Sequence, residues 1–212
     1  AAQKQNGSHK RVGVGLSLFY HGAGFTGSGE TRLPTRAGLE LTEAGKARVL
    51  TSSIEMGQGT ETIFCQLAAE ALGVNYDDVE FAQPNTAHVP DSGPTVASRT
   101  FLIVGLALKE EAYILKNKLE AFGREKWGAH AVALRNGELW ADGRSMSSFA
   151  ELAKEYLARE GSVKVLHGYS LPSDIQWDDD TYRGDAYPVF GWGADVAKVE
   201  VDLDTYEIKV LE

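Results

Sequence analysis

The sequence predicts an α+β fold, and three observations support this class. Two long stretches repeat apolar residues with helical spacing, and short β-branched runs lie around them. Strands and helices do not alternate strictly, as they would in a parallel α/β protein. The 212 residues, of which 43% are hydrophobic, suffice for one sizeable domain or two lobes that share a core. We therefore expect mixed sheets with packed helices.

The first half is expected to contribute strands and one helix. Residues 1–10 are polar and are expected to form a disordered N-terminal segment. The apolar run 11–20 predicts a buried strand. Residues 60–72 place apolar side chains on one helical face, and Gly73 ends that helix. Further strands are predicted at 39–41, 47–54 and 79–81, with a turn at 43–46.

A long helix dominates the second half. Its apolar residues recur at steps of four and three from Ser98 onward, which predicts one stripe facing the core: Phe101, Gly105, Leu108, Ala112, Leu115, Leu119 and Phe122. Asn136-Gly137 predicts a hairpin, and Ser148 with Glu151 predicts a capping box for a helix at 149–159. Strands are predicted at 163–166, 194–203 and 207–211. Residues 11–212 are expected to form one domain, with 11–130 and 131–212 as candidate lobes.

Composition excludes several function classes. A net charge of -9 argues against binding to nucleic acid, because no basic stripe is present to neutralise phosphates. Neither a membrane-spanning run nor a signal peptide is visible, so we expect a cytoplasmic protein without membrane contact. Cys65 is the single cysteine, and its mid-helix position favours a buried small hydrophobe over a reactive thiol.

A glycine-rich loop follows the first strand. Residues 22–27 read GAGFTG, formally the GxGxxG pattern of dinucleotide-binding folds. That fingerprint requires a helix directly afterwards, whereas residues 28–34 contain further helix breakers and no helical periodicity. The pattern therefore argues against a nucleotide-binding module. A flexible turn and a close backbone approach to a bulky ligand both stay open.

Two helix starts are candidate anion sites. Gly57-Gln58-Gly59 opens the helix at 60–72, where unpaired N–H groups and the helix dipole favour an anion, and the Gln58 amide suits a heterocycle edge. Residues 93–100 lead into the long helix, where Thr95 or Ser98 as an ordinary N-cap is an equally good explanation. We expect Gln58 and Ala97 to face one cleft that holds a flat, elongated anion.

Other catalytic patterns are missing. His9, His88, His130 and His167 show no metal-ligand spacing, so no metal ligand is predicted. The acidic run 178–180 is interpreted as a solvated loop. Neither a nucleophile elbow nor a Walker sequence occurs. Loops suited to a cofactor without an acid, base or nucleophile indicate part of an active site.

Three ordered motifs resemble one family. They are GLSLFYHGAGFTGSGE at 15–30, EMGQG at 55–59 and PDSGPTVASR at 90–99, followed by GADVAKVEVD at 193–202. Together they resemble the second molybdopterin-binding region of the molybdenum hydroxylases, the xanthine dehydrogenase and aldehyde oxidase family. The resemblance runs from about Arg11 to the C-terminus.

The resemblance implies which residues contact the cofactor. It implies that Met56, Gly57 and Gln58, with Gly59, hold the pterin and its phosphate end. It also implies that residues 95–100 bind mainly through backbone groups, with Ala97 closest to the metal centre. These residues are Thr95, Val96, Ala97, Ser98, Arg99 and Thr100. The first motif would line the cofactor or substrate side through His21, Gly22, Gly24 and Phe25.

The resemblance also implies the reaction and its partners. The cofactor would be molybdenum-molybdopterin, in the cytosine dinucleotide form of bacterial relatives, and electrons would leave through iron–sulfur centres and FAD on partner domains or subunits. A purine or other N-heterocycle would be hydroxylated with water as oxygen source; an aldehyde is the alternative substrate. The family's glutamate base follows a glycine in a GExP-type motif that these residues lack, so no catalytic residue is predicted. The chain is expected to be part of a larger subunit, with a non-catalytic interaction domain as the remaining alternative.

Overall fold

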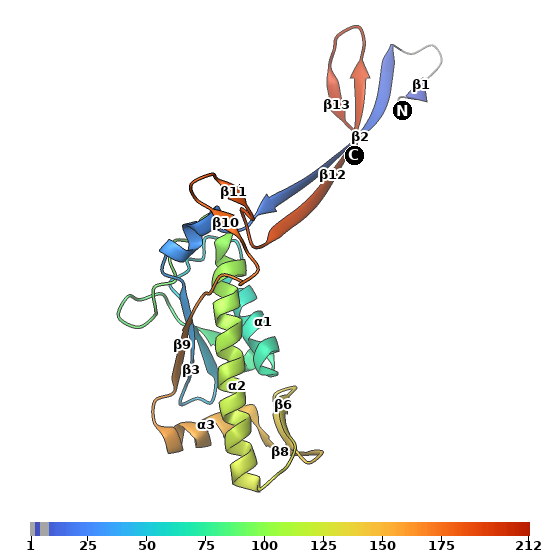
Figure 1. Ribbon diagram of the computed structural model, residues 1–212. Coiled ribbons are helices and arrows are strands. Elements are labelled where there is room, and N and C mark those ends of the chain that lie inside the picture. Colours follow the sequence, from blue (N-terminus) through green and yellow to red (C-terminus); the bar gives the residue numbers. More distant parts are fainter. Residues whose placement is uncertain (1–2, 5–8) are drawn as a thin grey trace. The chain divides into compact units, whose positions relative to one another are not determined.

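The computed structural model describes residues 3–4 and 9–212, which divide into two units (Figure 1). One unit comprises residues 23–188, and the other comprises the first 22 residues together with 189–212. This boundary differs from the expected lobes 11–130 and 131–212, because the first long strand pairs with a strand near the C-terminus. The α+β class is confirmed.

The larger unit is built on a four-stranded sheet. Its strand order is β5-β4-β3-β9, and only the β4–β5 pair is parallel. The bounds are β3 Arg36–Leu41, β4 Ala47–Leu50, β5 Val79–Phe81 and β9 Lys164–Gly168. Strands predicted at 39–41, 47–54, 79–81 and 163–166 are thus confirmed as elements, although β4 ends at Leu50.

Helices cover this sheet. α2, Gly105–Trp127, lies against β3 and β9, and α1, Thr60–Leu72, packs beside it (Figure 1). α3, Phe149–Glu160, begins with the predicted capping box between Ser148 and Glu151. Leu108, Leu115 and Leu119 of the predicted stripe are fully buried. The core therefore forms where the helical spacing places it.

Short elements complete the larger unit. A three-stranded sheet of β6 Val132–Arg135, β7 Glu138–Ala141 and β8 Arg144–Ser148 contains the predicted hairpin turn at 136–137. β10 Trp177–Asp178 pairs with β11 Arg183–Gly184. The 3₁₀-helices are η1 Gly27–Arg32 and η2 Tyr76–Asp78, and η3 Thr100–Val104 is a π-helix ahead of α2. The described part of the chain has no helix with the length and apolarity of a membrane span.

The smaller unit is one antiparallel sheet of order β1-β2-β12-β13. β2, Lys10–Gly22, pairs along its whole length with β12, Phe190–Asp202, and the edge strands are β1 Gln3–Lys4 and β13 Ile208–Val210. The expected disorder of residues 1–10 lies partly outside the described residues, and Gln3–Lys4 pairs with β2.

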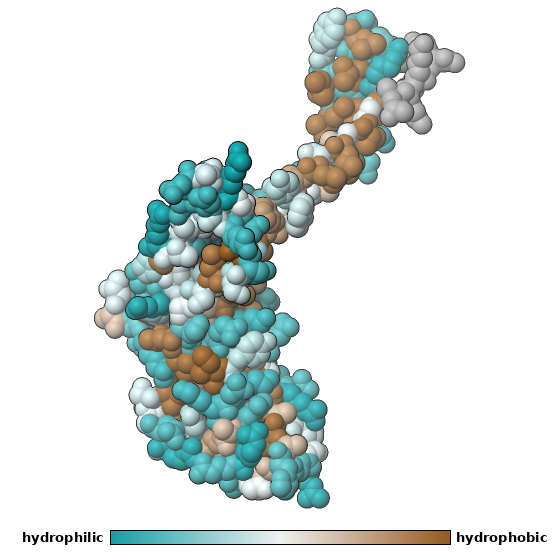
Figure 2. Space-filling model, in the orientation of Figure 1, coloured by the Kyte–Doolittle hydropathy of each residue, from teal (hydrophilic) through white to brown (hydrophobic). Residues whose placement is uncertain are grey.

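The prediction that residues 11–20 form a buried strand is wrong in one respect. The run is a strand, but Val14, Leu16 and Leu18 are 61–74% exposed. The described residues of this unit include no helix, so no second layer within the unit covers the sheet. Brown apolar side chains are accordingly visible along it (Figure 2).

Candidate functional site

Two of the predicted loops border one pocket in the larger unit. The pocket has a volume of about 440 Å³ and lies between the start of α1 and the residues that lead into η3. Its ten lining residues are all uncharged: Met56, Gln58, Thr60, Ile63, Thr95, Val96, Ala97, Ser98, Thr100 and Phe101. The expectation that Gln58 and Ala97 share a cleft is confirmed. Apolar walls with a few polar groups suit a flat heterocycle.

The loop at 55–59 is closed by its own acidic residue. The Glu55 carboxylate accepts hydrogen bonds from the N–H groups of Gly57 (2.6 Å), Gly59 (3.1 Å) and Glu61 (3.1 Å). Bonds from Gly59 and Glu61 hold the pKa of Glu55 below its ordinary value. The expectation that the start of α1 offers its N–H groups to an external anion is therefore corrected. An internal carboxylate occupies that position.

Gln58 also bonds within this loop. Its Oε1 accepts from the Met56 N–H at 2.7 Å, and its Nε2 donates to the Ile54 carbonyl and to Thr60 Oγ1, both at 2.7 Å. The side chain nevertheless lines the pocket. A ligand that recruits the Gln58 amide must therefore replace bonds that this amide already makes.

The loop at 94–100 is in the opposite state. Within the described residues, the backbone N–H groups of Val96 and Ala97 donate no hydrogen bond to protein. Ala97 and Ser98 have φ angles of +52° and +54°, in the left-handed region that non-glycine residues rarely adopt. Strain of this kind gathers at ligand-binding sites. The wall formed by this loop therefore combines open donors with an unusual backbone.

The predicted start of the long helix differs in detail. The helix opens as the π-helix η3, whose N-cap is Arg99, without a side-chain capping bond. Neither proposed cap serves that role, since Thr95 Oγ1 accepts from the Ile54 N–H at 3.1 Å and so joins the two loops. π-Helical turns are rare in proteins overall, and those that occur are often found at functional sites.

The glycine-rich loop is hydrogen-bonded to the 94–100 loop. The Gly24 N–H donates to the Ala97 carbonyl at 2.9 Å, and the Phe25 N–H donates to Glu30 Oε1 at 2.9 Å. Our expectation of no helix after Gly27 is wrong, because η1 begins there. It is a six-residue 3₁₀-helix, not the α-helix that a dinucleotide-binding turn requires.

The structure brings seven of the fourteen predicted site residues to the pocket lining. Gly24, Phe25, Gly57, Gly59 and Arg99 belong to the same unit but lie outside the lining, and the Arg99 side chain is fully buried. His21 and Gly22 end β2 in the smaller unit. The seven in the lining are Met56, Gln58, Thr95, Val96, Ala97, Ser98 and Thr100.

Three lining residues were not predicted from the sequence. Ile63 and Phe101 were assigned to core stripes, yet they are 37% and 41% exposed and line the pocket with Thr60. All three occupy the first helical residues after a predicted loop. Their position in the first turn, where the helix leaves the loop, was the signal that distinguishes them from the stripes.

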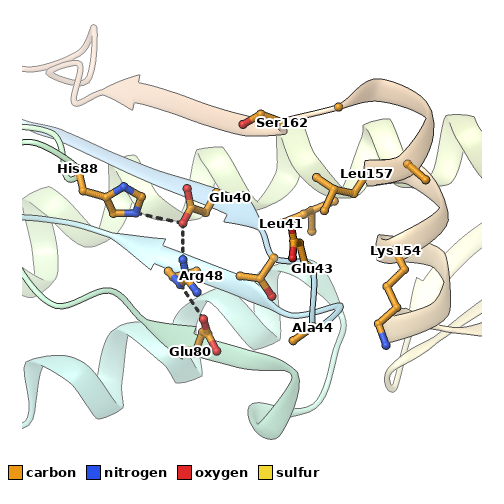
Figure 3. Close-up of a pocket in the computed structure, with 13 residues that line it drawn as sticks. Glu40, Leu41, Glu43, Ala44, Arg48, Glu80, His88, Lys154, Leu157 and Ser162 are labelled. Atoms are coloured by element: carbon orange, nitrogen blue, oxygen red, sulfur yellow. Dashed lines mark hydrogen bonds and ion pairs between the residues drawn. The ribbon is translucent and has the colours of Figure 1, made fainter.

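A larger groove of about 900 Å³ lies elsewhere on this unit (Figure 3). His88 and Arg48 both contact Glu40, at 3.1 and 2.9 Å, and Arg48 also bonds Glu80 at 2.6 Å. These charges are partners of one another, and the groove contains none of the predicted site residues. Size alone therefore does not make it the better candidate.

Two buried titratable groups also lie outside the pocket. Burial raises the pKa of Cys65 to about 11, which confirms an inert buried thiol. Burial raises the pKa of Glu111 to about 7, and neither carboxylate oxygen has a hydrogen-bond partner among the described residues. Glu111 belongs to α2 and to none of the pockets described here. It is not placed to act as a catalytic base.

Comparison with known proteins identifies the family. A family model described as molybdopterin cofactor-binding domain matches residues 1–212. Xanthine dehydrogenase 2 of Arabidopsis thaliana is 25% identical over 198 residues, 92% of this chain and 13% of that protein. Aldehyde oxidoreductase of Megalodesulfovibrio gigas is 26% identical over 99% of this chain and 20% of that protein.

The fold is also similar to that of a solved structure. Quinoline 2-oxidoreductase from Pseudomonas putida 86 superposes with a TM-score of 0.72 and 26% identity, over 96% of this chain and 26% of that one. The chain thus spans about a quarter or less of the length of these three proteins. It belongs to the molybdopterin cofactor-binding domain family, to which the xanthine dehydrogenase and aldehyde oxidoreductase relatives are similar over this region.

Proposed function

We propose that the pocket between the 55–59 and 94–100 loops binds the pterin of a molybdenum cofactor in a xanthine dehydrogenase-like hydroxylase. The observation that carries this proposal is the wall at Val96 and Ala97, where open N–H groups adjoin a left-handed backbone. A pterin presents ring acceptors and flat faces, which suit such donors together with the apolar side chains of Met56, Ile63 and Phe101.

The residues present fit this cofactor. The backbone of 95–97 would donate to the pterin edge, and the Gln58 amide would contact it after exchanging its loop bonds. Because the lining is uncharged, an anionic phosphate end would be held by backbone N–H groups and hydroxyls, without a lysine or arginine. When bound, the cofactor supplies the oxidative hydroxylation of an electron-poor carbon with water as oxygen source. This chain contributes binding and orientation.

The proposal extends to the form of the cofactor, the location of the protein, its partners and its substrate. We infer the cytosine dinucleotide form of the cofactor, a cytoplasmic location, and partners that include the rest of the subunit and iron–sulfur and FAD domains or subunits. Homologues that are parts of multi-domain or multi-subunit proteins support this arrangement. The substrate is a purine or another N-heterocycle, in line with relatives named for xanthine and quinoline. An aldehyde is the second candidate, favoured by the relative named for that class.

The test uses the full-length subunit purified with its partners. We expect molybdenum close to one atom per chain, cytidine monophosphate on acid release of the nucleotide, and turnover of hypoxanthine or quinoline. Greater turnover of aldehydes would select the second candidate. Absence of molybdenum from active preparations would contradict the proposal.

The isolated 212-residue chain is the matched control. It lacks the family's glutamate motif, so we expect no hydroxylase activity even with added cofactor. Turnover above a cofactor-only blank would show that the catalytic base lies within these residues.

A further inference from the structure

A buried ion pair includes Arg99, which lies in the chain between the pocket-lining residues Ser98 and Thr100. Glu30 and Arg99 are each at most 2% exposed. Arg99 Nε lies 3.2 Å from both carboxylate oxygens of Glu30, and Arg99 Nη2 lies 3.1 Å from Oε2. Neither side chain lines the pocket. The pair can therefore affect a ligand in the pocket only indirectly, through the backbone that it holds in place.

The remaining donors of Arg99 hold the chain ahead of the 94–100 loop. Arg99 Nη1 donates to the carbonyls of Ser92 at 2.7 Å and Pro94 at 3.1 Å, and Nη2 donates to Thr35 Oγ1. One guanidinium thus fixes both the entry and the exit of the loop. A lysine, with a single ammonium, cannot reproduce this planar fork.

Glu30 connects the pair to the glycine-rich loop. Its Oε1 accepts from the Phe25 N–H, and the neighbouring Gly24 N–H donates to the Ala97 carbonyl at 2.9 Å. The Ala97 backbone is therefore held from both sides, by Gly24 in one loop and by the anchored Arg99 in the other. Between these anchors lie the left-handed Ala97 and Ser98.

Two motif glycines make room for the pair. A Cβ on Gly24 would lie 2.9 Å from Glu30 Oε1, and a Cβ on Gly93 would lie 2.9 Å from Arg99 Nη1. Close approach of the backbone to a ligand is one of the two reasons expected from the sequence for glycine at position 24. In the structure, the space beside Gly24 is filled by the Glu30 side chain.

We propose that Glu30 and Arg99 are positioning residues, which hold Ala97 and Ser98 in the strained backbone that presents open N–H groups to the ligand. A left-handed conformation at two successive non-glycine residues costs free energy and persists only where surrounding contacts enforce it. The Glu30–Arg99 pair and the Gly24–Ala97 bond are those contacts. This inference rests on the proposed function for the identity of the ligand, but its structural part does not.

The first experiment measures backbone order without cofactor. Amide hydrogen exchange is compared for wild type, Glu30→Gln and Arg99→Lys, using full-length protein produced without molybdate. We expect the backbone amides at positions 24 and 99, which donate to the Ala97 and Val96 carbonyls, to exchange about tenfold or more faster in both variants. Unchanged exchange would overturn the inference. Because cofactor is absent, this result is independent of the proposed function.

The second experiment separates positioning from stability. Replacing a whole buried ion pair by apolar residues is often neutral for stability. We therefore expect Glu30→Met/Arg99→Met to recover most of the melting temperature that the single variants lose. Molybdenum content should stay about fivefold or more below wild type, because the loop is no longer preorganised. Recovery of molybdenum together with melting temperature would assign the pair a merely structural role and overturn the inference.

Arg48→Met is the matched control. It removes an arginine that bonds two glutamates, but in the groove of Figure 3, which shares no lining residue with the pocket. Its molybdenum content should equal wild type. If wild type itself binds no molybdenum, the proposed function fails while the exchange result still decides the positioning role. If none of the Glu30 and Arg99 variants folds, the pair is a folding element and the inference is overturned.

Discussion

The two loops that border the pocket share a sequence plan but differ in their hydrogen bonds. Each contains glycine ahead of a helix: Gly57 and Gly59 in the first loop, and Gly93 before the second. In the first loop the N–H groups are taken by Glu55, and the Gln58 amide bonds within the loop. In the second, the N–H groups of Val96 and Ala97 have no acceptor among the residues that the structure describes. A glycine-bearing helix start therefore does not identify an anion site until the local acceptors are counted.

The distance along the chain to the supporting residue explains the difference. Glu55 lies two to six residues from the N–H groups that donate hydrogen bonds to it, so it closes its loop locally. Arg99 is fixed by Glu30, 69 residues away, and neither side chain is part of the pocket lining. Long-range support orders the second loop while leaving its donors to a ligand.

The largest expected effect comes from alanine at Gly93. Its φ is +73°, and an added Cβ would lie 2.5 Å from the Pro34 carbonyl oxygen and 2.9 Å from Arg99 Nη1. Backbone strain and the clash together should lower the free energy of unfolding by roughly 2–4 kcal/mol. Urea unfolding measures this loss, and molybdenum content should fall with it.

Gly57→Ala sharpens that comparison. Gly57 also has a positive φ, +103°, but an added Cβ meets no atom within 4 Å. Only the strain remains, about 1–2 kcal/mol. Equal losses in the two variants would show that φ alone matters and that the Arg99 anchor does not distinguish the loops.

Much of the fold was predictable from local patterns. The helix at 60–72, the hairpin at 136–137 and the capping box at 148–151 follow from spacing and turn chemistry, and the structure confirms each. The burial of residues 11–20 was not predictable, because an apolar strand has the same sequence pattern whether or not other elements of the protein cover it. Unit boundaries were missed because β2–β12 pairing is long-range.

The site was predictable in position but not in chemistry. Motifs placed Gln58 and Ala97 at one pocket, as the structure confirms. The occupation of the α1 start by Glu55 was not predicted, although a carboxylate two residues before Gly57 was a readable signal. The Glu30–Arg99 pair depends on a contact between distant loops, which a single sequence does not specify.

The third prediction concerns Glu55 and pH. Backbone bonds, foremost from Gly59, hold its pKa below the ordinary value of 4.5. Such a carboxyl stabilises the folded state above that value and loses its contribution as pH falls through the lowered pKa. Glu55→Gln should therefore lower the melting temperature at pH 7, and the difference from wild type should shrink as pH falls below 4.5 through the lowered pKa.

Melting curves between pH 7 and pH 3 measure this convergence. Glu43→Gln is the control, since Glu43 lies in the turn after β3 and makes no comparable set of bonds among the described residues. A difference that persists unchanged at pH 3 would mean that the carboxylate charge does not close the 55–59 loop.

The smallest expected effect belongs to Gln58→Ala. The side chain makes three bonds within an exposed loop, so the melting temperature should fall only slightly, by the equivalent of about 0.5–1 kcal/mol. Cofactor contact by the amide exchanges one bond for another. Because a loop bond is given up, the gain is at most that of one neutral hydrogen bond, about 1.5 kcal/mol, which corresponds to a loss of molybdenum occupancy of up to roughly tenfold under subsaturating supply.

Gln83→Ala is the matched variant for this last prediction, because Gln83 is an exposed glutamine outside the pocket lining. Its occupancy should equal wild type. If Gln58→Ala also retains full occupancy, the 55–59 loop is a closed structural turn whose amide stays with Met56 and Ile54. Recognition would then fall to the 94–100 loop alone, and the two loops would differ in function as they already differ in hydrogen bonding.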